Sequence, residues 1–149
     1  GQDLGGWRCV DAFAGTGALG FEAASRGAHD VLLVEQDRSL VLQLAQTQHR
    51  LQADMVRIQR GDGVAALRAL QPGSVDLVFL DPPFGSERLD AAVQAAAAAV
   101  GPNGWVYLEA AAPWTDTMVK PSGLAVTRHL KAGMVHAHLL RHSGETPHA

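Results

Sequence analysis

The stretch that decides the fold is Asp11-Ala12-Phe13-Ala14-Gly15-Thr16-Gly17-Ala18-Leu19-Gly20, which follows the short apolar run from Trp7 to Asp11. Its three glycines match the spacing G-x-G-x-x-G of a loop that joins a strand to a helix. Glycine has no Cβ, so the backbone of such a loop can approach a ligand closely. The pattern predicts either a tight turn that binds nothing or a loop that binds an adenosine-containing cofactor.

The residues around this loop alternate between strand-like and helix-like patterns. We expect strands over 7–11, 31–34, 56–58, 75–80 and 105–108, helices over 18–26, 38–53, 64–70 and 88–100, and two successive strands over 124–130 and 134–140. This order predicts one α/β domain over residues 1–149, with a mostly parallel sheet and an antiparallel hairpin at one edge. Ligands of such sheets bind beyond the carboxyl ends of the strands. We expect the polar tail over 143–149 to be frayed.

An acidic residue stands at or just after the end of each of the first four predicted strands: Asp11, Glu35, Asp62 and Asp81. These carboxylates would repel a pyrophosphate, because two unit charges about 4 Å apart interact by roughly 4 kcal/mol at an effective dielectric near 20. They would attract S-adenosylmethionine, which joins adenosine to a cationic sulfur and an amino-acid end and has no phosphate. The acid pattern therefore favours a methyl donor over a dinucleotide such as NAD.

The acids and the glycine-rich loop have separate predicted roles in holding this cofactor. We expect Glu35, 20 residues after Gly15, to accept hydrogen bonds from the ribose hydroxyls. Asp62 is expected to accept from the adenine amino group, although Asp at this position also predicts a helix N-cap. Asp11 and the backbone from Phe13 to Gly17 are expected to hold the methionine end. The complete predicted cofactor set is Asp11, Phe13, Ala14, Gly15, Thr16, Gly17, Glu35, Gln36, Asp62 and Gly63.

A second motif, Asp81-Pro82-Pro83-Phe84, directly follows the buried strand predicted over 75–80. Two prolines alone indicate no more than a rigid turn, but an acid and an aromatic ring beside them suit a planar amine. Asp81 and the carbonyl of Pro82 can accept the two protons of an exocyclic amine and turn its lone pair toward a methyl group, while Phe84 stacks on the base. Rigid prolines keep these acceptors in place, and a base inside a helix must first be flipped out. We predict that Asp81, Pro82, Pro83 and Phe84 carry the catalysis.

Taken together, these motifs give the chain a family resemblance. It resembles the bacterial 16S rRNA guanine-N2 methyltransferases, the RsmD family, in both motifs and in Glu22-Ala23, Ser25-Arg26-Gly27-Ala28, Val34-Glu35-Gln36-Asp37, Asn103-Gly104-Trp105, Tyr107-Leu108-Glu109 and Lys131-Ala132-Gly133. The resemblance implies a three-layer, Rossmann-like class I methyltransferase fold with a seven-stranded sheet. It also implies methyl transfer from S-adenosylmethionine to the exocyclic N2 amine of a guanine in 16S rRNA during assembly of the small ribosomal subunit, which leaves S-adenosylhomocysteine.

One departure from the family pattern concerns the N-terminus. Family members carry a segment before the first strand, with a basic hairpin, that helps to bind RNA and cover the cofactor, and we expect that segment to be absent from this chain, which begins at Gly1. Three alternatives therefore stay open. The chain is a domain that binds S-adenosylmethionine but is inactive without that segment, another amino-methyltransferase acting on adenine in DNA or RNA or on a protein amide, or a dinucleotide-dependent oxidoreductase.

Composition sets limits on partners and location. Twelve Lys and Arg against fifteen Asp and Glu give a net charge of −3, which disfavours a non-specific polyanion binder but allows a local basic patch. The longest apolar runs fall short of the roughly 18–20 residues that span a bilayer. We expect a monomer without membrane contact that acts on 16S rRNA or the assembling small subunit.

The cysteine and histidine content bears on metal binding and redox environment. The single Cys9 excludes an intrachain disulfide and a cysteine zinc cluster, and it suits a reducing cytoplasm. His136 and His138 share a face of the last predicted strand. We interpret that face as exposed, and we predict no metal site.

Overall fold

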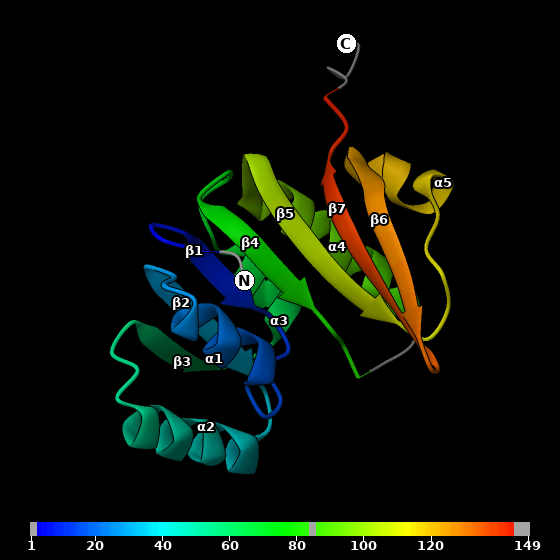
Figure 1. Cartoon of the computed structure of the whole chain (residues 1–149). Helices are drawn as coiled ribbons and strands as arrows, with labels where there is room; N and C mark the ends of the chain where they lie inside the picture. Colours follow the sequence, from blue (N-terminus) through cyan, green and yellow to red (C-terminus); the bar gives the residue numbers. More distant parts are fainter. Residues whose placement is uncertain (1–2, 84–85, 145–149) are drawn as a thin grey trace.

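The computed structural model describes residues 3–83 and 86–144 of the chain, and Figure 1 shows how they fold. Within these residues, seven strands form one sheet in the order β3-β2-β1-β4-β5-β7-β6. The strands are β1 (Arg8–Asp11), β2 (Asp30–Glu35), β3 (Val56–Arg60), β4 (Val75–Leu80), β5 (Val100–Ala110), β6 (Leu124–Ala132) and β7 (Val135–His142). The helices are α1 (Ala18–Ser25), α2 (Arg38–Leu51), α3 (Gly63–Arg68), α4 (Ser86–Ala99) and α5 (Asp116–Val119), followed by the 3₁₀ turn η1 (Lys120–Ser122).

The sheet is mixed in the way that the sequence predicts. Strands β1 to β5 pair in parallel, and β7 runs antiparallel to both β5 and β6. Parallel strands are connected by helices that cover both faces of the sheet, so their side chains are buried on both sides. Residues 31–34 of β2 illustrate this burial, since all four are at most 6% exposed. The predicted α/β fold with a C-terminal antiparallel hairpin is confirmed.

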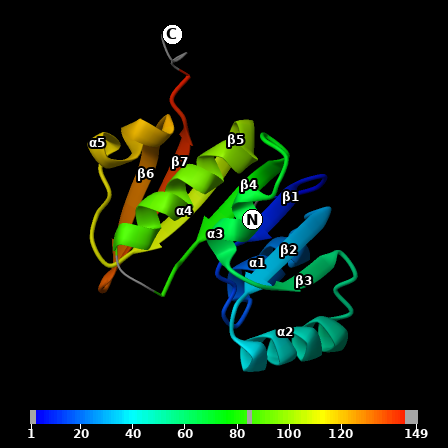
Figure 2. The same ribbon diagram turned by 180° about the vertical axis from the view of Figure 1, so that it is seen from behind.

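Helices on both faces of the sheet complete a three-layer structure. Viewed from behind in Figure 2, α3 and α4 cover one face, and the core there joins Val78 and Leu80 of β4 to Ala92 and Ala96 of α4. The core on the other face includes Leu33 of β2 together with residues of α1 and α2. The alanines of α4 let that helix approach the sheet closely. In the described part of the chain, no helix is long and apolar enough to cross a lipid bilayer.

Two predicted boundaries differ from the structure, and one short helix was not predicted. Strand β5 begins at Val100 rather than at Trp105, because Val100 already pairs with Val75 before the register shifts. The hairpin turn falls at Gly133 and Met134, because β6 continues to Ala132. Helix α5 was not predicted, since its four residues are too few to show a helical period.

The expectation that His136 and His138 lie on an exposed strand face is wrong for His138. This side chain is only 1% exposed. Its Nδ1 donates to the Leu108 carbonyl over 3.1 Å, and its Nε2 accepts from the Trp114 backbone N–H over 2.9 Å. Burial is the main cause that lowers the pKa of His138. The neutral His138 side chain therefore links β7 to β5 and to the loop before α5.

The two buried hydrogen bonds of His138 lead to a prediction about stability. Replacing His138 with Leu leaves the Trp114 N–H and the Leu108 carbonyl buried without this partner, and an unsatisfied buried group costs about 1–3 kcal/mol. We expect His138→Leu to lower the free energy of unfolding in urea by that amount or more. The exposed His49 on α2 is the control, and His49→Leu should change stability by no more than about 0.5 kcal/mol. Equal effects of the two substitutions would contradict the assigned role.

Candidate active site

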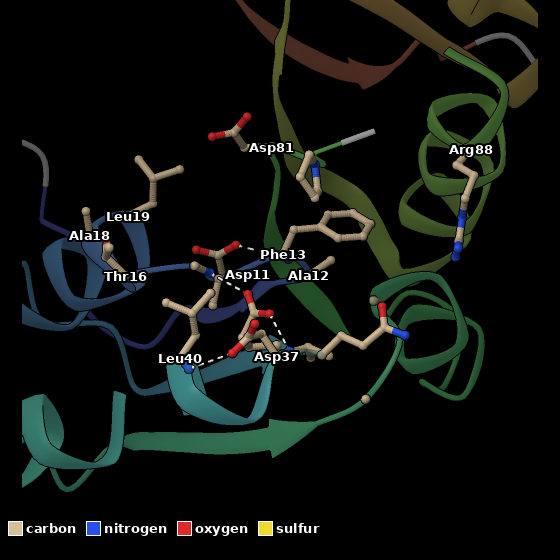
Figure 3. Close-up of a pocket in the computed structure, with 18 residues that line it drawn as sticks. Asp11, Ala12, Phe13, Thr16, Ala18, Leu19, Asp37, Leu40, Asp81 and Arg88 are labelled. Carbon is tan, nitrogen blue, oxygen red and sulfur yellow. Dashed lines mark hydrogen bonds between the residues drawn. The ribbon is translucent and has the colours of Figure 1, made fainter. Parts of the chain in front are cut away.

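A cavity of about 670 Å³ opens at the carboxyl ends of β1, β2 and β4, and Figure 3 shows its lining. Its volume falls in the range of pockets for small organic ligands. Most of the predicted cofactor residues line it, namely Asp11, Phe13, Ala14, Gly15, Thr16, Glu35, Gln36 and Gly63. Asp81 and Pro83 of the second motif line the same cavity. The structure therefore brings the two predicted motifs together, while Phe84 lies outside the described residues.

The glycine-rich loop takes its shape from two glycines with positive φ. Gly15 has a φ of 56° and Gly17 a φ of 83°, values that side chains with a Cβ rarely adopt. A Cβ on Gly17 would also lie 2.6 Å from Leu44 Cδ2. Gly17 does not line the cavity but stands at the N-cap of α1. It shapes the loop from behind, whereas Gly15 presents backbone to the cavity.

Glu35 joins two loops that line the cavity, the glycine-rich loop and the loop after β2. Its Oε1 accepts from the Gly15 backbone N–H over 2.9 Å, and its Oε2 accepts from the Asp37 backbone N–H over 2.8 Å. An ionised carboxylate offers about four acceptor positions, so these bonds leave capacity for further donors. Asp37 in turn caps α2 by accepting from the backbone of Ser39 and Leu40.

Asp62 serves as a helix cap in the structure. Its Oδ2 accepts from the Ala65 N–H at the start of α3 over 2.9 Å, which confirms the N-cap prediction. Its Oδ1 accepts from the Arg88 guanidinium over 2.6 Å. Asp62 does not line the cavity but Arg88 does, and in Figure 3 the Phe13 ring lies between Arg88 and Asp11. Sequence reasoning missed Arg88 because no motif marks it, and only the folded chain brings α4 beside α3.

Asp11 is the buried member of the acidic rim, the four carboxyl groups of Asp11, Glu35, Asp62 and Asp81 at or after the strand ends. It is 2% exposed, and its Oδ1 accepts a long hydrogen bond of 3.4 Å from the Phe13 N–H. Burial, with smaller contributions from Asp81, Glu35 and Glu109, raises the pKa of Asp11 to about 7. At neutral pH this carboxyl group is therefore only partly ionised, and the rim carries less charge than four ionised carboxylates would.

A second cavity of about 580 Å³ lies on the other side of the Asp-Pro-Pro turn. Asp81 and Pro83 line both cavities, while Pro82 and Glu109 line this one. Burial and the neighbouring Glu109 carboxyl raise the pKa of Asp81 to about 6. Glu109 belongs to a tripeptide that the sequence reasoning noted, but it was not assigned to the site. The Asp-Pro-Pro turn thus forms a shared wall between a cavity of cofactor size and a second one.

Gly63 lets α3 begin directly against the end of β1. A Cβ on Gly63 would lie 2.1 Å from the Ala12 carbonyl oxygen, which belongs to the backbone and cannot turn aside. We expect Gly63→Ala to destabilise the fold by about 1–3 kcal/mol, as overpacking does, and to lower Tm by roughly 2–4 °C per kcal/mol. Gly61→Ala is the control, because its Cβ would meet only Gln59 Nε2 at 4.0 Å. Thermal unfolding compares the two, and equal Tm values would contradict the predicted contact.

Comparison with known proteins identifies the family. The family model described as conserved hypothetical protein 95 matches residues 1–141. Ribosomal RNA small subunit methyltransferase D of Escherichia coli is 36% identical over 104 residues, covering 69% of this chain and 50% of that protein. The protein of the same name from Haemophilus influenzae is 33% identical over 106 residues, covering 68% of this chain and 55% of that protein. The chain thus spans about half the length of the curated relatives that it matches.

A solved structure shows the same architecture along nearly the whole chain. The putative methyltransferase yhhF from Escherichia coli superposes with a TM-score of 0.82 at 28% identity, covering 95% of this chain and 79% of that one. This match confirms the class I methyltransferase fold. The chain belongs to the family of conserved hypothetical protein 95, and its relatives in that family confirm the resemblance to the RsmD methyltransferases.

Proposed function

We propose that this chain binds S-adenosylmethionine in the first cavity and transfers its methyl group to the exocyclic N2 amine of a guanine in small-subunit rRNA. The observation that carries the proposal is the pair of cavities that share Asp81 and Pro83. A methyl donor on one side of this wall and a base on the other would meet at Asp81. The relatives named ribosomal RNA small subunit methyltransferase D support rRNA as the substrate.

The residues of the first cavity fit the proposed cofactor. Glu35 keeps acceptor capacity for two ribose hydroxyls after it has bonded Gly15 and Asp37. Asp11, whose pKa is raised to about 7, would be ionised by a cationic ligand, because an opposite charge within a few ångströms favours the charged form. Phe13 and Gly15 line the same cavity as Glu35 and Asp11. Asp62 holds the start of α3 beside the proposed adenine position.

Asp81 and Pro82 prepare the amine of the base for transfer. When bound, S-adenosylmethionine would supply an electrophilic methyl group, and its sulfur would leave with the electron pair of the bond to that methyl group. Asp81 and the Pro82 carbonyl accept hydrogen bonds from the two N–H groups of the amine, so that its lone pair is free to form the new bond. The amine loses one proton, which Asp81 or water takes up. Orientation of this kind is a major part of enzymatic rate enhancement.

The proposal is tested by transfer of tritiated methyl groups to small ribosomal subunits, naked rRNA and DNA. We expect label in the small subunit or its RNA, recovered as N2-methylguanosine after nuclease digestion. Label in DNA, or in methylated adenine, would overturn the proposed substrate. Absence of transfer despite binding of S-adenosylhomocysteine would show that this chain binds the cofactor without acting on these substrates.

The role of Asp81 predicts a loss of transfer without a loss of cofactor. Asp81→Ala should lower kcat/KM by about 10²-fold or more, the usual range for a positioned proton acceptor. Its affinity for S-adenosylhomocysteine in calorimetry should change less than about threefold, since one lost exposed contact contributes little. Asp90→Ala, an exposed acid on α4, should leave both values unchanged. An active Asp81→Ala variant would refute the assignment.

The raised pKa of Asp11 predicts a pH dependence of S-adenosylmethionine binding. Below pH 7 the carboxyl is protonated and must lose its proton to pair with the cation, so affinity should rise with pH up to about 7 and then level off. Calorimetry between pH 5.5 and 8.5 measures this profile. Asp11→Asn should flatten it, whereas the exposed Asp54→Asn should not. A profile that is flat in the unsubstituted chain would contradict the predicted ionisation.

A further inference from the structure

The second cavity contains an acidic side chain that the transfer chemistry leaves without a role. Glu109 lies near the end of β5, and its Oε1 accepts a hydrogen bond from the Tyr107 hydroxyl over 2.7 Å. The Tyr107 ring packs edge-on against Phe79, with centroids 5.9 Å apart and planes at 70°. This packing fixes the tyrosine hydroxyl, which in turn holds the Glu109 carboxylate by one oxygen. A carboxylate has acceptor capacity beyond one such bond.

Strand register places Glu109 beside Asp81. Leu80 of β4 pairs with Leu108 of β5. The residues that come next, Asp81 directly after β4 and Glu109 on β5, are therefore neighbours at the same end of the sheet. The Glu109 carboxyl lies near enough to raise the pKa of Asp81, and both residues line the second cavity. Two carboxyl groups side by side at one end of a cavity match a ligand that offers two adjacent N–H donors.

Guanine and adenine differ in this respect. On guanine the N1–H stands next to the N2 amine, so two donors lie side by side on one edge. On adenine the amine stands next to N1, which is an acceptor and carries no hydrogen. An ionised carboxylate only accepts hydrogen bonds. A pair of carboxylates could therefore accept from both N1–H and the N2 amine of guanine. With adenine, one of the two carboxylates would instead meet the lone pair of N1.

We propose that Glu109 is a specificity-determining residue that accepts the N1–H of the target guanine while Asp81 accepts from its N2 amine. This inference rests on the proposed N2 methylation and extends it to the choice of base. Tyr107 acts as a positioning residue, because it orients Glu109 without contacting the base. The buried side chains of Leu89 and Trp114 give the second cavity an apolar wall, and an unpaired polar group against such a wall is costly.

The test compares guanine with 2-aminopurine at the methylated position of the RNA. 2-Aminopurine keeps the C2 amine but has an acceptor at N1. We expect the unsubstituted chain to prefer guanine by about 10²-fold or more in kcat/KM, as sites built around a hydrogen bond do. Glu109→Gln, whose amide donates as well as accepts, should reduce this preference at least tenfold, while Glu109→Asp should retain it. An unchanged preference in Glu109→Gln would overturn the proposal.

Two controls separate this inference from the proposed function and from misfolding. Glu22→Gln, an exposed glutamate paired with Arg26 on α1, should leave the preference unchanged. Tyr107→Phe should weaken the preference without abolishing transfer, and it offers a second variant if Glu109→Gln does not fold. Absence of methyl transfer to guanine N2 by the unsubstituted chain would count against the proposed function instead.

A binding measurement tests the contact between Glu109 and the base independently of methyl transfer. In protein labelled with carbon-13 at the glutamate carboxyl groups and saturated with S-adenosylhomocysteine, guanosine monophosphate should shift the Glu109 signal, and adenosine monophosphate should not. The signal is identified by its absence in Glu109→Gln. Equal shifts with both nucleotides, or no shift at concentrations where guanosine monophosphate binds, would overturn the role of Glu109.

Discussion

Parallel strands bring their carboxyl ends to one edge of the sheet, and in this chain those ends carry acids. Asp11 ends β1, Glu35 ends β2 and Asp81 follows β4, so the fold gathers like charges that would otherwise stay apart. The protein meets this repulsion in two ways. Glu35 is tied to two backbone N–H groups, and Asp11 keeps its proton up to a pH of about 7. The proposed cationic ligand would provide the remaining compensation.

The same edge explains why two cavities adjoin. Because β4 is central to the sheet, with β1 on one side and β5 on the other, the turn after it borders a cavity on each side. The β1 side holds the glycine-rich loop and Glu35, which fit a nucleoside. The β5 side holds Glu109, fixed by Tyr107, which fits a donor edge of a base. One rigid turn contributes Asp81 to both cavities, and in the proposed function it joins the methyl donor to its acceptor.

Local patterns predicted the strands, the glycine-rich loop and the acids, because each depends on neighbouring residues. An unbroken apolar run predicted that β2 is buried on both faces, as it is. The glycines at positions 15 and 17 indicated a backbone with positive φ, which both residues have. Features that arise from distant contacts were not predicted. His138 bonds to the loop that contains Trp114 and stacks against His129 of β6, and Arg88 reaches Asp62 because α4 packs beside α3. Glu109 gains its place from the register of β5 against β4, which no local pattern encodes.

The central claim is that the acidic rim favours S-adenosylmethionine and its product over a cofactor that carries phosphate. Calorimetry tests this claim most directly. The chain is titrated at pH 8, where Asp11 is ionised, with S-adenosylhomocysteine and separately with NAD. Both ligands contain adenosine, but only NAD carries a pyrophosphate that the acids would repel. We predict saturable binding of S-adenosylhomocysteine and no measurable binding of NAD. Tight binding of NAD without binding of S-adenosylhomocysteine would contradict the assignment of the cavity to a methyl donor.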